Sequence, residues 1–138
     1  MSLYSQKTYD AGTLLKAAGL VAASAAGSVI LDLGDGLMDG DLVIDISAME
    51  VASNDEIYTI ALEGSSVAAM TSLSVTLAEK QVGNVPAPAD ADTTTGRHII
   101  PFRNELNGTL YRYVRIYTTV AGTIATGINY TAFLAKKG

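Results

Sequence analysis

The residue types that most often carry catalysis are scarce in this sequence. Its 138 residues include a single histidine, His98, and no cysteine. A histidine that acts as a general base needs a nucleophile and an orienting acid within hydrogen-bond reach. The acids closest to it in the sequence are Asp92 and Glu105, and no Gly-x-Ser-x-Gly nucleophile elbow is present. We therefore expect a structural or solvated role for His98, and we expect the chain not to be an enzyme.

A series of aspartates is the second group that could bind a ligand. The series consists of Asp32, Asp35, Asp39, Asp41 and Asp45. Calcium prefers oxygen ligands, but the spacing of an EF-hand loop and its closing Glu are absent. The alternation of residues 41–47 also places Asp41 and Asp45 on the solvent face of a strand. We expect a solvated acidic edge without a metal or cofactor, and a small metal-dependent enzyme is the weaker alternative.

Composition narrows the class of partner. The chain is 49% hydrophobic and only 17% charged, with a formal net charge of −5. An acidic chain is poorly suited to neutralising phosphates, so we expect no nucleic-acid partner. Gly, Ser, Thr or Asp interrupts every apolar run before it reaches the roughly 18 residues of a membrane helix, so we expect no membrane partner. A protein partner is the remaining expectation.

The charge is unevenly distributed along the chain. Residues 1–70 contain ten acids and two bases, a net charge of −8, whereas residues 71–138 contain four acids and seven bases, a net charge of +3. If the fold presents the two halves on separate surfaces, this contrast favours ordered association with a partner. If strands from both halves intermix, the contrast vanishes in space. Both outcomes are compatible with the sequence.

From Ser28 onward, apolar and polar residues alternate with a period of two, which is typical of half-buried strands. We expect strands near residues 29–33, 41–47, 58–62, 73–77, 98–102, 111–119 and 128–134. Turn residues separate them, including Gly34-Asp35-Gly36 and the tight turn Asn107-Gly108. Pro101 marks an edge strand or the end of a strand. With no amphipathic helix of ordinary length between these segments, the pattern predicts an all-β antiparallel sandwich.

The N-terminal residues 1–27 differ from the rest by their small side chains. We expect an extended or partly helical N-terminal arm that lies against a neighbour, followed by a single β-sandwich domain of residues 28–138. A secretory signal cleaved near Ala23-Ser24-Ala25 is the alternative, but Asp10 lies where such a signal is basic.

The segment Lys80 to Gly96 has the least strand character and contains prolines, aspartates and three consecutive threonines. We expect a long exposed loop there. A loop of this length in a small domain is either functional or mobile. A weak strand within Met70 to Val82 could also pair in another way.

Several of these segments together resemble a known family. They are Asp32-Leu33-Gly34 after an Ala/Ser-rich lead, the strand Leu42 to Ile46, Arg112-Tyr113-Val114-Arg115-Ile116, Gly122, Gly127 and Ala132-Phe133-Leu134. In this order, from about Gly27 to the C-terminus, the chain resembles the small capsid cement, or decoration, proteins of tailed bacteriophages. The matched positions are hydrophobic and turn positions without a catalytic residue. The N-terminal arm and the Pro/Thr-rich loop depart from the family pattern.

The resemblance implies a jelly-roll-like β-sandwich that oligomerises on the outer surface of the phage head and ties neighbouring major capsid protein subunits together. The small-residue arm would be buried if neighbouring subunits exchanged their arms. The resemblance and this arm together favour a homotrimer, with a homodimer as the alternative. A carbohydrate-binding or adhesive jelly-roll module of a tail or surface appendage is the second function. The absence of Trp counts against sugar binding, whereas the seven Tyr are compatible with it.

The strand near residues 111–119 carries the candidate interface. Alternation places Tyr111, Tyr113, Arg115 and Tyr117 on one face and Arg112 on the other. Because Tyr and Arg are enriched at interface hot spots, we hypothesise that the Tyr113/Arg115 face meets a neighbouring subunit or the capsid, while Arg112 closes the edge of the sandwich. In the alternative hypothesis the tyrosines form the core and Arg115 extends to solvent at its rim.

Overall fold

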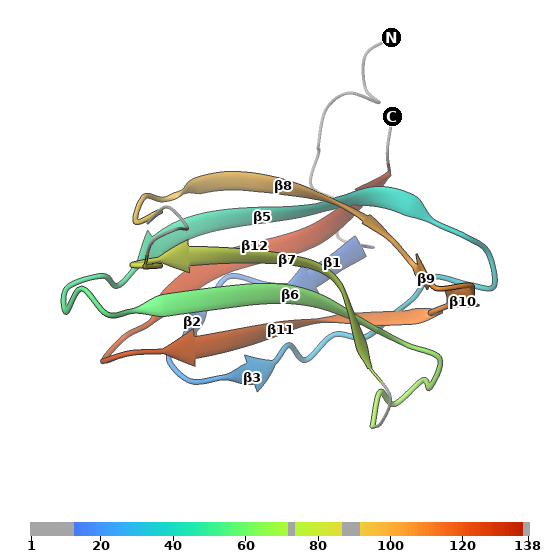
Figure 1. Ribbon diagram of the computed structural model, residues 1–138, viewed down its shortest axis with the longest axis horizontal. Helices are drawn as coiled ribbons and strands as arrows, with labels where there is room; N and C mark the ends of the chain where they lie inside the picture. The colour runs from blue at the N-terminus through green and yellow to red at the C-terminus, as the bar shows by residue number, and fades with distance from the viewer. Residues whose placement is uncertain (1–12, 72–73, 87–91, 137–138) are drawn as a thin grey trace, which may run out of the picture.

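The computed structural model describes residues 13–71, 74–86 and 92–136, which fold into two five-stranded antiparallel sheets and one two-stranded sheet (Figure 1). At the centre of the first sheet, β12 (Ile128–Lys136) pairs with β5 (Asp39–Met49). Beyond β5 lies the edge strand β8 (Gly96–Arg103), as Pro101 predicts. We call this layer the β5 sheet.

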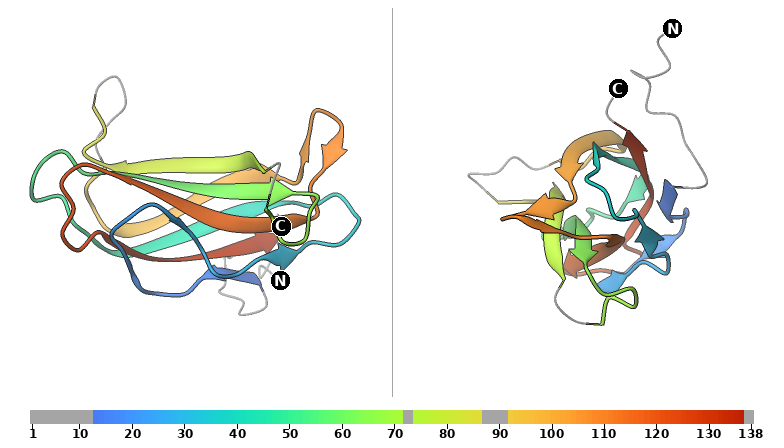
Figure 2. Two further views of the ribbon diagram at one scale, coloured as in Figure 1. Left: turned by 90° about the horizontal axis from the view of Figure 1, so that it is seen from below. Right: turned by 90° about the vertical axis from the view of Figure 1, so that its right-hand side faces the viewer.

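The second layer, called the β6 sheet, has β11 (Tyr113–Ala121) and β6 (Ile57–Ser65) at its centre. Its edge strand next to β6 is β7 (Val75–Gly83). The two sheets lie face to face (Figure 2), so the predicted antiparallel β-sandwich is confirmed. No helix long and apolar enough to cross a membrane occurs in the described part of the chain.

The core lies between the inner faces of the sheets, and the period-two pattern predicted it correctly. The alternating apolar residues of four strands are all buried there: Leu42, Ile44, Ile46, Tyr58, Ile60, Leu62, Val114, Ile116, Ile128, Tyr130, Ala132 and Leu134. In a strand every second side chain points to the same face, so one alternating run supplies one buried row.

Four short strands near the N-terminus line the remaining edges. β1 (Leu14–Lys16) and β2 (Leu20–Val21) pair with β12, and β3 (Ala25–Ala26) and β4 (Leu31–Asp32) pair with β11. The chain therefore crosses from one sheet to the other and closes one side of the sandwich.

This placement refines the predicted N-terminal arm. The sequence analysis expected residues 1–27 to lie against a neighbour, but residues 14–26 pair with β12 and β11 of their own chain. Leu15 is fully buried in the core cluster, so this part of the arm contributes a core side chain. Residues 1–12 lie outside the described residues.

The order of the long strands can be compared with the strand order of a jelly roll. Six described strands have eight residues or more, and the first of them pairs with the last and the second with the fifth. The third and fourth, β7 and β8, form edges of opposite sheets. A full jelly roll has eight strands in two Greek keys, so the pairing establishes only the coarser description, an antiparallel β-sandwich.

The predicted loop from Lys80 to Gly96 begins later in the structure. β7 continues through Gly83, and Val82 is fully buried opposite Tyr58. Polar side chains on the exposed side of this edge strand obscured its alternation in the sequence. Residues 87–91, in the middle of the predicted loop, lie outside the described residues.

Two predicted turns show why glycine is needed. β9 (Glu105–Leu106) and β10 (Thr109–Leu110) form a hairpin whose turn residues Asn107 and Gly108 have φ values of 52° and 84°. Positive φ at both residues is the requirement of a type I′ turn, as Asn-Gly predicts. Gly127 has φ of 89°, and a Cβ there would collide with the carbonyl oxygen of Val21. The N-terminal segment thus packs directly on the loop before β12.

Substitution of Leu15 tests whether the N-terminal segment belongs to the core. We expect Leu15→Ala to reduce the free energy of unfolding by about 2–5 kcal/mol, because it leaves a cavity in a packed interior. The matched control is Leu20→Ala in the same segment, where the side chain is 59% exposed and the expected loss is below about 0.5 kcal/mol. Chemical denaturation measures both, and equal losses would show that Leu15 is not a core residue.

Candidate functional site

Cross-strand ion pairs involve every arginine of the chain. Across β5 and β8, Arg97 donates from Nε to Asp45 Oδ1 at 2.6 Å, and Arg103 Nε lies 3.5 Å from Asp39 Oδ1. Asp45 is opposite Arg97, and Asp39 is opposite Arg103, in the strand register. Opposite charges on directly facing positions stabilise a sheet and disfavour a shifted register.

The β6 sheet repeats this arrangement on β11. Arg115 Nε donates to Glu63 Oε1 at 2.9 Å, and these residues also face each other in the register. Arg112 binds two aspartates, with Nε 2.6 Å from Asp32 Oδ1 and Nη1 2.8 Å from Asp35 Oδ1. The Arg112 hydrogen bond holds the pKa of the Asp32 carboxyl below its usual value. Arg112 thereby joins β11 to β4 at the edge where the sequence analysis expected it.

These pairs decide the question of charge asymmetry. All four arginines come from the second half of the sequence, and all their acidic partners come from the first. Strands of both halves therefore intermix in the fold. The arginines of the second half are paired with acids of the first half within the same chain.

The predicted solvated acidic edge is correct for Asp32, Asp35, Asp39 and Asp45, whose side chains are 38–91% exposed, but needs correction at Asp41. Four of its five aspartates bind arginines, and the fifth, Asp41, is only 7% exposed although it was expected on a solvent face. The alternation was correct, but the outer face of the β5 sheet is buried at this place. Val43 and Phe133 on the same face are fully buried as well. Within the described ranges, no group of three or more His, Asp or Glu is arranged to hold a metal.

The structure excludes one of the two hypotheses for the Tyr/Arg strand. Val114 and Ile116 point into the core and are fully buried. The alternating residues Tyr113, Arg115 and Tyr117 are half-buried on the outer face of the β6 sheet, which we call the tyrosine face. The hypothesis that these tyrosines form the core is therefore wrong. Tyr111 precedes β11 and is also half-buried.

His98 lies on the edge strand β8 beside Asp92. The distance from His98 Nε2 to Asp92 Oδ2 is 3.6 Å, and Asp92 forms a β-bridge with Gly83 at the end of β7. The hydroxyl of Thr94 donates to the other oxygen of Asp92, Oδ1, at 3.1 Å. These contacts connect the edge strands of the two sheets and fit the expected structural role of His98.

One end of the sandwich is held by carboxylates that bind backbone amides. Glu50 accepts hydrogen bonds from the amides of Ala125, Thr126 and Gly127 at 2.7–2.9 Å, which lowers the pKa of its carboxyl. Glu56, fully buried, accepts bonds from the amide of Ser53 and the side chain of Asn84. These carboxylates were not predictable from the sequence, because loop contacts leave no periodic signal.

The opposite end is organised by Asn104, which is fully buried. Its Oδ1 accepts the amide of Met38 at 2.7 Å, its Nδ2 donates to the carbonyl of Gly36 at 3.1 Å, and its carbonyl accepts the amide of Tyr111 at 2.7 Å. Asn104 thus joins the loop before β5 to the β9–β10 hairpin. A buried polar side chain with satisfied partners gives its surroundings a defined geometry.

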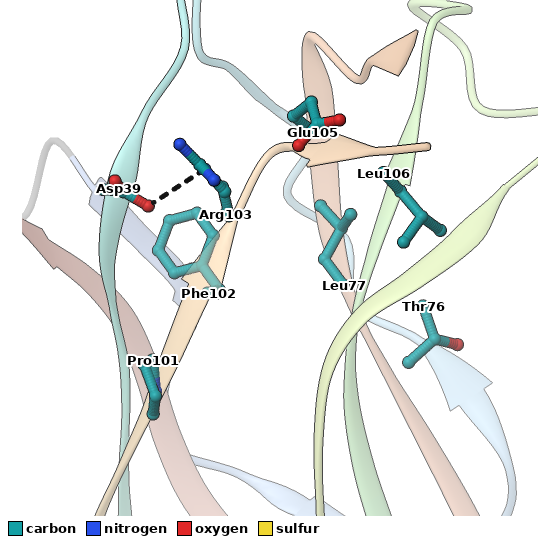
Figure 3. A pocket seen from close by; sticks show the side chains of 8 residues that line it. All are labelled: Asp39, Thr76, Leu77, Pro101, Phe102, Arg103, Glu105 and Leu106. Atoms are coloured by element: carbon teal, nitrogen blue, oxygen red, sulfur yellow. Dashed lines mark ion pairs between the residues drawn. The ribbon is translucent and has the colours of Figure 1, made fainter. Parts of the chain in front are cut away.

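Three exposed leucines occupy the segments that Asn104 joins. They are Leu37, Leu106 and Leu110, with exposed fractions of 51%, 40% and 43%. We call this region the leucine end. Beside it a pocket of about 320 Å³ opens between the edge strands β7 and β8 (Figure 3). The pocket is lined by Asp39, Thr76, Leu77, Pro101, Phe102, Arg103, Glu105 and Leu106.

No protein-family model matches this chain, and no curated protein matches it. The resemblance noted in the sequence therefore stays a prediction. The tyrosine face and the leucine end are the two candidate interaction surfaces that the geometry defines, and only the first was predictable from the sequence. Leu37, Leu106 and Leu110 lie in loops and in a short hairpin, where single apolar residues are ordinary and indicate nothing by themselves.

The amide-bound Glu50 predicts a specific pH dependence. Its carboxyl has a pKa below the ordinary 4.5, so it stabilises the fold above that pH and loses this contribution as the pH falls through the folded-state value. We expect Glu50→Gln to reduce stability near pH 7 and to make the decline toward about pH 3 shallower than in wild type.

Urea unfolding at a series of pH values measures this effect. Glu79→Gln, at an exposed position of β7, is the control and should keep the wild-type profile. If the Glu50→Gln profile has the same slope as wild type, the amide contacts of Glu50 do not stabilise the fold.

Proposed function

We propose that this chain is a structural protein of a tailed-bacteriophage virion, which binds the outer surface of the head and cements neighbouring major capsid protein subunits. The proposal starts from the resemblance in the sequence. The observation that carries it furthest is the tyrosine face, which presents Tyr113 and Tyr117 on either side of the Arg115–Glu63 ion pair.

The chemistry of the tyrosine face suits a protein partner. Arg115 and Glu63 are 21% and 19% exposed and neutralise each other within the chain, so a partner can cover them without burying an unpaired charge. Tyrosine offers a large apolar ring and a hydroxyl that can hydrogen-bond at an interface. Because these side chains stand on a central strand, ordering them on binding costs little entropy.

The chain's few reactive groups are engaged in structural contacts, which favours a structural role over a catalytic one. His98 faces Asp92 between the edge strands. Glu50 and Asp55 bind loop groups, with Asp55 accepting the amide and hydroxyl of Thr123. A group that holds a loop in place is poorly suited to exchange protons with a substrate.

We propose a homo-oligomer as the binding form, a homotrimer in preference to a homodimer. Pairing of residues 14–26 with β12 and β11 offers a route, since an N-terminal segment exchanged between copies would make the same contacts in its neighbour. The expected location is the outside of the phage head, with the major capsid protein as the partner.

Binding to heads tests this function. We expect the wild-type protein to co-sediment with empty heads assembled from the major capsid protein of the same genome. The triple variant Glu63→Gln/Arg115→Gln/Tyr117→Ala should remain folded but weaken oligomer assembly or head binding by roughly 2 kcal/mol or more if the face is a hot spot.

The control is Asp45→Asn/Arg97→Gln, which neutralises a comparable cross-strand pair on the other sheet. It should bind like wild type. The proposal is rejected if wild-type protein does not bind heads, or if it binds a glycan array instead. Equal oligomer assembly and head binding by the tyrosine-face variant and its control would show that the tyrosine face is not an interface.

A further inference from the structure

The leucine end is an exposed apolar surface that shares no residue with the tyrosine face. We propose that the leucine end and its pocket form the surface that contacts the phage head, taking up an apolar side chain flanked by Lys or Arg from the major capsid protein. This inference rests on the proposed function and adds to it the contact surface and the chemistry of the partner.

Asn104 holds together the two segments that carry the leucines. Leu37 precedes Met38, whose amide and carbonyl both bond to Asn104, and Leu106 and Leu110 belong to the hairpin that follows Asn104. The hairpin projects from one end of the sandwich, as the left-hand view of Figure 2 shows. In the hairpin register Leu106 is opposite Thr109 and Leu110 is opposite Glu105, so the two leucines lie on opposite faces of the hairpin, and Leu106 is the one that lines the pocket. Scattered exposed leucines are common on protein surfaces, but a projecting hairpin with an exposed leucine on each face, beside a pocket, marks a candidate binding surface.

The pocket has an apolar wall and room for one large side chain. Phe102, only 5% exposed, and Leu77 come from the edge strands of opposite sheets and face the opening (Figure 3). A volume of about 320 Å³ is at the lower end of the range for ligand pockets. The pocket is therefore better suited to one anchoring side chain of a partner than to a larger ligand.

Insertion of a side chain is favoured over addition of a strand to the open edge. Pro101 lies within β8 and has no N–H to donate to a further strand. Arg97 and Arg103 flank it on the same strand. Proline and charged residues on an edge strand disfavour pairing with another chain.

The charges around the leucine end select the partner. The pocket contributes two carboxylates, Asp39 and Glu105, and one guanidinium, Arg103, which already lies 3.5 Å from Asp39. Asp35, two residues before Leu37, is 91% exposed at its side chain, and the one guanidinium that it binds, Arg112, is shared with Asp32. A second copy of the chain would bring these carboxylates together, whereas a Lys- or Arg-bearing partner complements them. We therefore assign the major capsid protein, rather than a second copy, to this surface.

Two sets of variants test the assignment against the same empty heads. Leu106→Ser/Leu110→Ser should weaken head binding at least about tenfold, while its melting temperature and oligomer mass stay those of wild type. Leu20→Ser is the matched control, because Leu20 is 59% exposed and belongs to β2, a strand that Figure 1 shows at the other end of the sandwich from β9 and β10. Asp39→Asn/Glu105→Gln should weaken binding at low salt and make it less sensitive to added salt.

The outcomes separate this inference from the proposed function. Failure of wild-type protein to bind heads rejects both. Binding by wild type that the leucine variants retain in full overturns the inference and leaves the function intact. A smaller oligomer in the leucine variants assigns the surface to a second copy, which also overturns it.

Discussion

The edges of a β-sheet carry unpaired N–H and C=O groups, and a sandwich must pair, cover or protect every such edge. This chain meets the constraint differently on its two sides. Residues 14–32 pair with β12 and β11 and close one side with backbone hydrogen bonds. On the other side β7 and β8 remain edges, protected by Pro101 and by charged side chains. The closed side supplies a core residue, Leu15, and the open side holds the pocket.

The ion pairs of this chain also depend on how its strands pair. Each arginine meets an acid from the first half of the chain, and three of these pairs join directly facing positions of neighbouring strands. A shift of one residue would separate the charges and turn the core side chains outward. The pairs are partly exposed, so each contributes little stability alone. Their main effect is to favour one register, which keeps the tyrosine face and the leucine end in fixed positions.

The inner faces of the strands were predictable from the sequence, since burial on one side of a strand leaves a period of two. Leu42, Ile44 and Ile46 illustrate this success. The prediction that Asp41 faces solvent was wrong because the outer face of the β5 sheet is buried there. Alternation shows which face of a strand a residue lies on, but not whether that face is covered. The burial of Leu15 beside β12 and the bonds of Asn104 to Gly36 and Met38 depend on residues far away in the sequence. The tyrosine face could be proposed from one strand, whereas the leucine end joins segments that only the fold brings together.

The central claim is that a β-sandwich with one closed and one open side binds the outside of a phage head through its leucine end. Electron cryo-microscopy of empty heads, with and without added protein, tests it most directly. The account predicts extra density on the outer surface that fits the sandwich, with the β9–β10 hairpin directed at the shell. Heads without extra density, or sandwiches that contact the shell through the end holding Glu50 and Asp55, would contradict it.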